Sequence, residues 1–428
     1  MAGLGFVIRK LHKSDTLFNS LRAYFYGMMA TSGPWIVTVV ALGIYFQLTN
    51  HLGSVEENLK GRALVLYNFG FSLVLCSPVV VIANRYLSDG IFKGDLREAL
   101  PTLLGAMFFV FLYTTPLVLF FYFYILDLTP LEALLSSYFF IIVAGVWLLN
   151  SFIACLKNYN GITLSFTIGM VACVVCSVPL VDYGAMGTVF GFGLGLSFTF
   201  ASLLGMILAQ YPKGEGKLFS FIPFFKSYWE LCLGGLIYNA AIWVDKWILW
   251  FTPEATQLPS GLLMYPEYDG AMILSYLSII PSLALFMVSQ ETYFLEHYYR
   301  YYEDIRNHAS FRRIMTNHES LKSAVAAIAR NTLIFQFSVA TLLVLLAPKI
   351  LVYMNMNVTQ LGIFRFGVLG ATFQITTTYL TILLSYCEER KLVLIIQAFL
   401  FVTNAIFTYL STFLGFSYYG RGFPNCSQ

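Results

Sequence analysis

Charged side chains are scarce in this chain of 428 residues. Asp, Glu, Lys and Arg make up 11% of it, whereas a soluble domain carries about 25%. Hydrophobic residues make up 58% and the mean hydropathy is +0.73. No water-soluble fold can bury so large an apolar surface, so the composition indicates a protein whose main solvent is the lipid bilayer. The formal net charge of +3 is too small to suggest nucleic-acid binding.

The motifs that would mark an enzyme are also lacking. There is no P-loop, no G-x-S-x-G nucleophile elbow and no D-x-D motif of the kind that binds a metal in nucleotide-sugar transferases. All five histidines lie in predicted loops or end segments. Cys173 and Cys176 form a C-x-x-C pair inside an apolar run with no histidine nearby, which favours packing over a metal or redox site. We therefore predict that the protein is not an enzyme and has no metal or cofactor.

What the chain does contain is about eleven long apolar runs. Each can cross the roughly 30 Å of hydrocarbon as a helix, and helices are required because lipid offers no partner for unpaired backbone groups. No signal-peptide cleavage site follows the first run, so we predict that it is retained. The sequence thus predicts an all-α polytopic membrane protein, with spans near 24–48, 63–85, 99–124, 133–156, 162–181, 185–209, 228–251, 270–293, 324–347, 361–386 and 391–414.

Positive charges between the runs fall on alternate loops. Of the 25 Lys and Arg residues, most lie on loops, or at the span ends beside them, that share the side of the N-terminus. The opposite loops hold only Lys60, Arg62, Lys349 and Arg421. Because cytoplasmic loops are enriched in Lys and Arg, the pattern predicts a cytoplasmic N-terminus.

The polar stretch 210–227 separates the first six spans from the last five. We predict a cytoplasmic linker here, joining a six-helix bundle at 24–209 to a second bundle at 228–414. An amphipathic cytoplasmic segment at 1–23 precedes them and a short tail at 415–428 follows. Two such bundles, related as parallel repeats, occur in some transporters.

Two adjacent charges, Asp245 and Lys246, fall inside a predicted span. Charge in a membrane helix is costly and marks a functional candidate. Neighbours on a helix point about 100° apart, so we expect the two not to pair face to face. Either Lys246 snorkels to the outer interface among tryptophans, or Asp245 faces a cavity, with Arg365 as a plausible counter-ion. The candidate substrate-pathway residues are Asp245, Lys246, Arg365, Asn239, Trp243 and Gln374.

The predicted cytoplasmic segment 294–322 mixes tyrosines with charges of both signs. It is interpreted either as a helical extension and return, or as a docking surface for a cytosolic partner. The docking candidates are Tyr298, Tyr299, Tyr301, Tyr302, Arg312 and Arg313. Elsewhere, Gly187, Gly191 and Gly195 form a G-x-x-x-G ladder in an apolar setting, which predicts close helix packing.

Several short motifs, in a shared order along most of the chain, resemble those of the PelG family, the integral membrane proteins of Pel exopolysaccharide systems. The motifs are Met1–Phe6, Arg9–Leu11, Asp15–Leu17, Ser32–Trp35, Tyr238–Asn239, Ile242–Trp247, Tyr268–Met272, Ile279–Pro281 and Glu291–Phe294.

This resemblance implies two helical bundles of the MATE-like, MOP-exporter type, with twelve spans expected in the family. It implies transport of Pel polymer, an N-acetylhexosamine-rich chain, across the bacterial cytoplasmic membrane for the biofilm matrix. It also implies partners: a cytosolic glycosyltransferase and membrane subunits that include a cyclic-di-GMP receptor. Two alternatives stay open, a non-transporting scaffold that anchors and activates the glycosyltransferase and a flippase for lipid-linked oligosaccharide.

Overall fold

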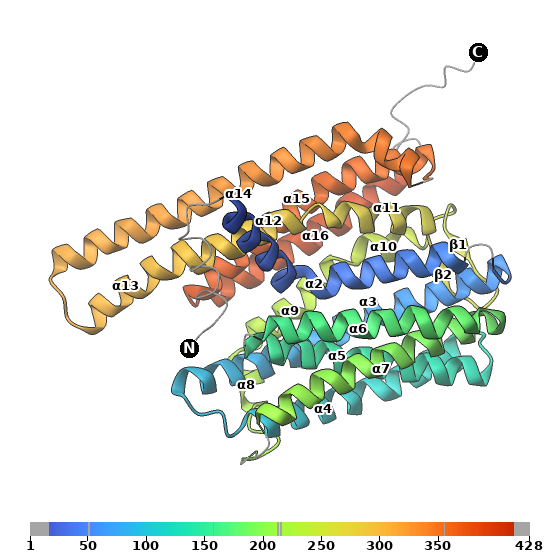
Figure 1. Ribbon diagram of the computed structural model, residues 1–428, viewed down its shortest axis with the longest axis horizontal. Coiled ribbons are helices and arrows are strands. Elements are labelled where there is room, and N and C mark those ends of the chain that lie inside the picture. Colours follow the sequence, from blue (N-terminus) through green and yellow to red (C-terminus); the bar gives the residue numbers. More distant parts are fainter. Residues whose placement is uncertain are drawn as a thin grey trace. The chain divides into compact units, whose positions relative to one another are not determined.

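The structure is a computed structural model that describes residues 17–49, 52–156, 158–211, 214, 216–354 and 356–414. Among these residues the only strands are β1 (Thr256–Gln257) and β2 (Leu263–Met264), an antiparallel pair with Thr256 opposite Met264. All other regular structure is helical (Figure 1). The predicted all-α class is thereby confirmed. Most of the predicted N-terminal segment and the whole tail 415–428 lie outside the described residues.

The chain divides into two compact units. Unit A comprises Pro34–Pro266 and residues 384–414, and unit B comprises Glu267–Leu383 with the described residues before Pro34. The last described helix thus belongs with the earlier part of the chain. The predicted bundles at 24–209 and 228–414 stay a prediction.

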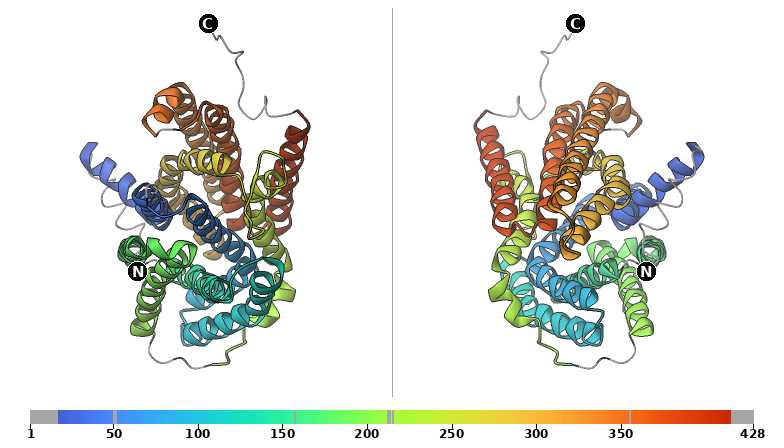
Figure 2. Two further views of the ribbon diagram at one scale, coloured as in Figure 1. Left: turned by 90° about the vertical axis from the view of Figure 1, so that its right-hand side faces the viewer. Right: turned by 90° about the vertical axis from the view of Figure 1, so that its left-hand side faces the viewer.

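Unit A is built on α3, which packs against α5, α7 and α9, while α9 and α10 pack against α16 (Figure 2). A capping box starts α5, because the Thr129 hydroxyl accepts from the Glu132 backbone and the Glu132 carboxylate accepts from the Thr129 backbone. The helices of unit A are α2 (Leu17–Thr49, from Pro34), α3 (Val55–Lys93), α4 (Ala99–Phe120), η1 (Phe121–Ile125), α5 (Pro130–Cys155), α6 (Tyr159–Ser177), η2 (Val178–Tyr183), α7 (Gly184–Gln210), α8 (Ile222–Ser227), α9 (Trp229–Ala241), α10 (Val244–Leu249) and α16 (Arg390–Leu414).

The predicted glycine ladder lies on α7 and faces α6. A Cβ added at Gly191 would clash with Ser177, and one added at Gly195 would clash with Cys173. The prediction of close helix packing is confirmed. It also accounts for Cys173, whose fully buried thiol donates to the Phe192 carbonyl at 3.5 Å.

Unit B contains α11 (Pro266–Leu277), α12 (Ile280–Ser289), the π-helical turn η3 (Gln290–Phe294), α13 (Leu295–Arg306), α14 (Phe311–Tyr353) and α15 (Val358–Tyr386). The predicted span 270–293 is broken between α11 and α12, where Pro281 occupies the first turn of α12 and has no N–H to continue the helix. Helices α13 and α14 form the predicted extension and return at 294–322 (Figure 1).

Among the described residues, nine helical stretches are long and apolar enough to cross a membrane. The difference from the predicted eleven has two causes. The stretch Tyr159–Gln210 contains two predicted spans, and the predicted span 228–251 is divided into the short helices α9 and α10. Large apolar side chains such as Phe399, Phe407 and Phe413 of α16 are about 70% exposed on the chain, as expected of surfaces that face lipid.

Loops predicted to share a side of the membrane meet in unit A. At one end, Arg85 of α3 contacts Glu388, and Arg390 contacts Ser227 at the end of the linker. At the other end, Glu57 accepts from the Ala185 backbone N–H and Lys60 pairs with Glu132. The alternation inferred from the sequence therefore holds for these loops.

Candidate functional site

The span that carries Asp245 and Lys246 is discontinuous. A single helix over 228–251 was predicted and is wrong, because α9 ends at Ala241 and α10 begins at Val244. A break in a membrane helix frees backbone carbonyls that must find other donors. Asn404 of α16 donates to the Ala241 carbonyl at 2.8 Å, and the Lys246 ammonium donates to the Ile242 carbonyl at 3.2 Å. Side chains thus stabilise the break.

The two charges pair with each other. Lys246 Nζ lies 3.5 Å from Asp245 Oδ1, and the two residues are 4% and 2% exposed. The expectation that these neighbours do not pair is wrong, because α10 starts only at Val244 and the long lysine side chain folds back over this first turn. Burial of the ammonium also argues against the snorkelling interpretation. Lys246 Nζ lies 5.3 Å from the centre of the Trp243 ring, which adds a cation–π contact.

Aromatic rings fix α10 against α3. Tyr67 stacks on Trp250 with ring centres 4.7 Å apart and planes 3° apart, and Phe71 stacks on Trp247 at 5.4 Å and 5°. We call these four residues the aromatic stack. Between its two α3 members, Gly70 leaves room for Trp243, because an added Cβ would lie 2.9 Å from that ring.

Polar contacts extend this anchoring to the hairpin that follows α10. The Tyr67 hydroxyl donates to the Leu263 carbonyl at 2.8 Å and accepts from the Leu263 N–H at 3.1 Å. One residue along α3, the fully buried Asn68 accepts from the Tyr122 hydroxyl at 3.1 Å. Sequence reasoning missed the contribution of α3. Its signal was the spacing of Tyr67, Gly70 and Phe71, which lie at i, i+3 and i+4 and so share one face of the helix.

The other predicted pathway residues have separate roles. The Asn239 amide donates to the Gly235 carbonyl of its own helix at 2.9 Å. Arg365 and Gln374 lie half-buried on α15, in unit B. Arg365 Nε is buried with no hydrogen-bond partner among the described residues. Its pairing with Asp245 of unit A stays a prediction.

The predicted docking tyrosines divide by exposure. Tyr299 and Tyr302 are 63% and 46% exposed. Tyr298 and Tyr301 are half-buried, with ring contacts to Tyr302 at 4.5 Å and to His318 at 5.5 Å respectively.

The two docking arginines also differ. Arg313 is held by Asp304, 2.9 Å between Nη2 and Oδ1, whereas Arg312 is exposed and forms no ion pair within the described part of the chain. Within that same part, no group of three or more His, Cys, Asp or Glu residues is arranged to hold a metal ion.

Solved structures with the same fold are transporters of the MOP superfamily. An outward-facing multidrug resistance MATE family transporter matches with a TM-score of 0.61 at 14% identity, covering 93% of this chain and 97% of that one. A MOP superfamily transporter from Pyrococcus furiosus matches with a TM-score of 0.57 at 14% identity, covering 97% of each chain. An inward-facing MATE family transporter gives 0.57 at 13% identity, covering 92% and 99%. The chain therefore has the MOP transporter fold, as predicted.

The family is shown by sequence. The PelG family model, described as "Putative exopolysaccharide Exporter (EPS-E)", matches residues 1–427. The chain belongs to the PelG family, which confirms the resemblance seen in its motifs. No curated protein matches it. Family and fold together point to membrane transport and not to enzymatic catalysis.

Proposed function

We propose that this protein exports a Pel-type, N-acetylhexosamine-rich polysaccharide across the bacterial cytoplasmic membrane to the biofilm matrix. Its N-terminus lies in the cytoplasm, and it works with a cytosolic glycosyltransferase and with membrane subunits that include a cyclic-di-GMP receptor. The family membership and the MOP fold support transport of an exopolysaccharide. The charge asymmetry of the loops supports the orientation.

One observation carries the proposal at the level of residues. The broken helix α9–α10 holds the buried Asp245–Lys246 pair within an apolar span. Transporters place substrate sites at discontinuous helices, where freed backbone groups and buried charges can exchange partners. A neutral sugar polymer offers hydroxyl and amide groups that both donate and accept hydrogen bonds, so it can compete for the carboxylate and for the ammonium in turn.

The test replaces each charge by a neutral side chain of similar size. Asp245→Asn and Lys246→Met should each reduce exported polymer at least tenfold per molecule of membrane-inserted protein, and the amount of inserted protein is measured in the same cells because each variant is also expected to be less stable. Polymer is measured separately outside the cells and in the cytoplasm. Asp182→Asn, which neutralises an exposed carboxylate between α6 and α7, is the matched control and should export normally.

Normal export by both charge variants would refute the proposed site. If export stopped only when residues 294–322 were removed, a scaffold that activates the glycosyltransferase would replace the transport proposal. Accumulation of lipid-bound oligosaccharide in the charge variants would instead support a flippase.

A further inference from the structure

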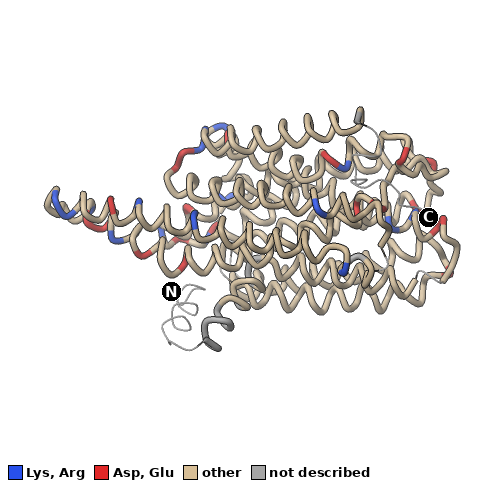
Figure 3. The backbone as a smooth tube through the Cα atoms, turned by 90° about the horizontal axis from the view of Figure 1, so that it is seen from above, with Lys and Arg blue, Asp and Glu red and all other residues tan. Residues whose placement is uncertain are grey.

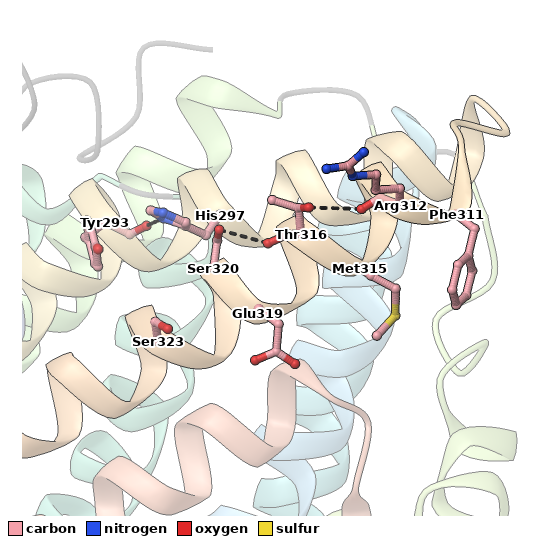
Figure 4. A pocket seen from close by; sticks show the side chains of 9 residues that line it. All are labelled: Tyr293, His297, Phe311, Arg312, Met315, Thr316, Glu319, Ser320 and Ser323. Carbon is pink, nitrogen blue, oxygen red and sulfur yellow. Dashed lines mark hydrogen bonds between the residues drawn. The ribbon is translucent and has the colours of Figure 1, made fainter.

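The hairpin α13–α14 carries two adjacent hollows near its tip. One, of about 770 Å³, is lined by Tyr293 of η3, by His297 of α13 and on α14 by Phe311, Arg312, Met315, Thr316, Glu319, Ser320 and Ser323 (Figure 4). The other, of about 530 Å³, is lined by Arg300, Ser310, Arg312, Arg313, Thr316 and Asn317. Arg312 and Thr316 line both, so the two hollows are neighbours on the first turns of α14. We call them the apolar hollow and the arginine hollow.

The apolar hollow exposes side chains that normally lie inside proteins. Phe311 is 78% exposed, Tyr293 47% and Met315 42%. Phe311 and Met315 are four residues apart and point to the same side of α14 (Figure 4), which suits an elongated apolar partner such as one face of a helix. The carboxylate at this hollow, Glu319, is already held by Lys322 at 3.2 Å.

The arginine hollow contains no carboxylate among its lining residues. Arg300 is paired with Glu296 and Arg313 with Asp304. Arg312 points away from the apolar hollow's floor residues Phe311 and Met315 (Figure 4), and its exposed guanidinium is available for a bidentate contact with a carboxylate. Apolar and cationic surfaces thus lie side by side.

The length of α14 indicates that the hairpin tip binds a protein and not the lipid surface. The helix has 43 residues, about 64 Å at 1.5 Å per residue. Its predicted span starts near residue 324, so Phe311 lies about 20 Å along the axis from the hydrocarbon edge. Headgroups extend only about 5–8 Å beyond that edge. Figure 3 shows that positions occupied by charged residues recur along this hairpin, while most of the remaining tube lacks them.

We infer that the hairpin tip is a docking site for an acidic amphipathic helix of a cytosolic protein. The apolar face of that helix fills the hollow of Tyr293, Phe311 and Met315, and its carboxylates contact Arg312. The inference takes from the proposed function only the side of the membrane on which the hairpin lies. The probe-binding measurement tests the docking site and the polymer-export assay tests the proposed function, so either can fail without the other.

The experiment uses the full chain in nanodiscs of neutral phosphatidylcholine. The probe is a fluorescent designed helix of about 18 residues (five turns) with leucines on one face and glutamates elsewhere. A matched probe carries lysine at every glutamate position. Fluorescence anisotropy should give a dissociation constant at least tenfold lower for the acidic probe.

Variants assign the contact. Phe311→Ser and Met315→Ser should each weaken the acidic probe at least fivefold, and Arg312→Glu should reverse the preference between the two probes. Tyr299→Ser, which changes an exposed α13 side chain that lines neither hollow, should leave both affinities within twofold. Because all four positions are exposed, thermal melting should be unchanged and will reveal any variant that fails to fold.

Equal binding of the two probes, or equal weakening by Tyr299→Ser, would overturn the inference. Displacement of the acidic probe by vesicles containing phosphatidylglycerol, but not by neutral vesicles, would assign the tip to the membrane surface instead.

Discussion

Tyr67 of α3 and Trp250 of α10 lie face to face, with ring centres 4.7 Å apart. The two residues come from different predicted spans, and the Tyr67 hydroxyl also bonds both backbone groups of Leu263. One side chain thus fixes the short helix and the hairpin that follows it. The short helix α10, which follows the break after α9, is thereby anchored to α3.

Truncation of the stack should destabilise the protein strongly. Trp250 is 3% exposed, and Trp→Ala in a packed interior costs about 3–5 kcal/mol. Tyr67→Phe keeps the stacked ring and loses only the hydroxyl bonds, at about 0.5–1.5 kcal/mol each. Thermal unfolding in detergent, followed by tryptophan fluorescence, should place Trp250→Ala well below Tyr67→Phe. Equal melting temperatures would show that the stack does not support α10.

Gly70 should tolerate no larger residue. A Cβ there would lie 2.9 Å from the Trp243 ring, and overpacking typically costs about 1–3 kcal/mol. Gly205→Ala is the matched control, because an added Cβ on this α7 glycine meets nothing within 4 Å. In the same unfolding measurement we expect Gly70→Ala to melt at a lower temperature and Gly205→Ala to melt at or above the parent value.

The Asp245–Lys246 pair should show strong coupling in a double-mutant cycle. Removal of one member leaves the other charge buried without its opposite charge in this pair, at about 3–5 kcal/mol, whereas Asp245→Asn with Lys246→Met removes both charges. The double variant should therefore be less destabilised than the sum of the singles. The fraction of protein that stays folded after mild heating in detergent is compared between the parent, the two single variants and the double variant. Simple additivity of the losses would mean that the two charges act independently.

A cation–π sandwich holds the turn that precedes α16. The Tyr228 ring lies 4.9 Å from the Arg85 guanidinium and 4.8 Å from that of Arg390, and Glu388 pairs with Arg85 at 2.8 Å. Each cation–π contact at such a part-exposed site contributes about 0.5–1 kcal/mol.

Tyr228→Leu should therefore loosen this turn without unfolding the protein. Hydrogen exchange at residues 387–390 should accelerate several-fold, while exchange within α9 stays constant. Lys391→Ala, which changes the exposed residue next to Arg390 in the first turn of α16, is the control, and the same acceleration in that variant would argue against the sandwich.

The sequence predicts the positions of the spans well and their interruptions poorly. Hydropathy locates apolar runs regardless of their partners, which is why the spans appear at the predicted places. The run from Asn239 to Trp247 contains neither proline nor glycine, so no residue in it predicts that the helix breaks at Ile242. The break is stabilised by Asn404, 163 residues further along the chain, and such a contact is visible only in three dimensions.

The same limit applied to α3. In the sequence, its aromatic residues look like the ordinary composition of a membrane helix. Only the structure shows that this face of α3 contacts Trp243, Trp247 and Trp250. By contrast, the extension and return at 294–322 were predictable. Charges of both signs along this segment make its burial in lipid unfavourable, and the segment is long enough for two helices.

The placement of α16 in unit A bears on how the protein is made. Helices α9 and α10 are synthesised and inserted into the membrane before Asn404 is made. The Ala241 carbonyl therefore has no bond from Asn404 during the insertion of α11 to α15. The candidate site is therefore completed only after α16 has been synthesised. A nascent chain arrested before α16 would therefore lack the Asn404 donor for the Ala241 carbonyl.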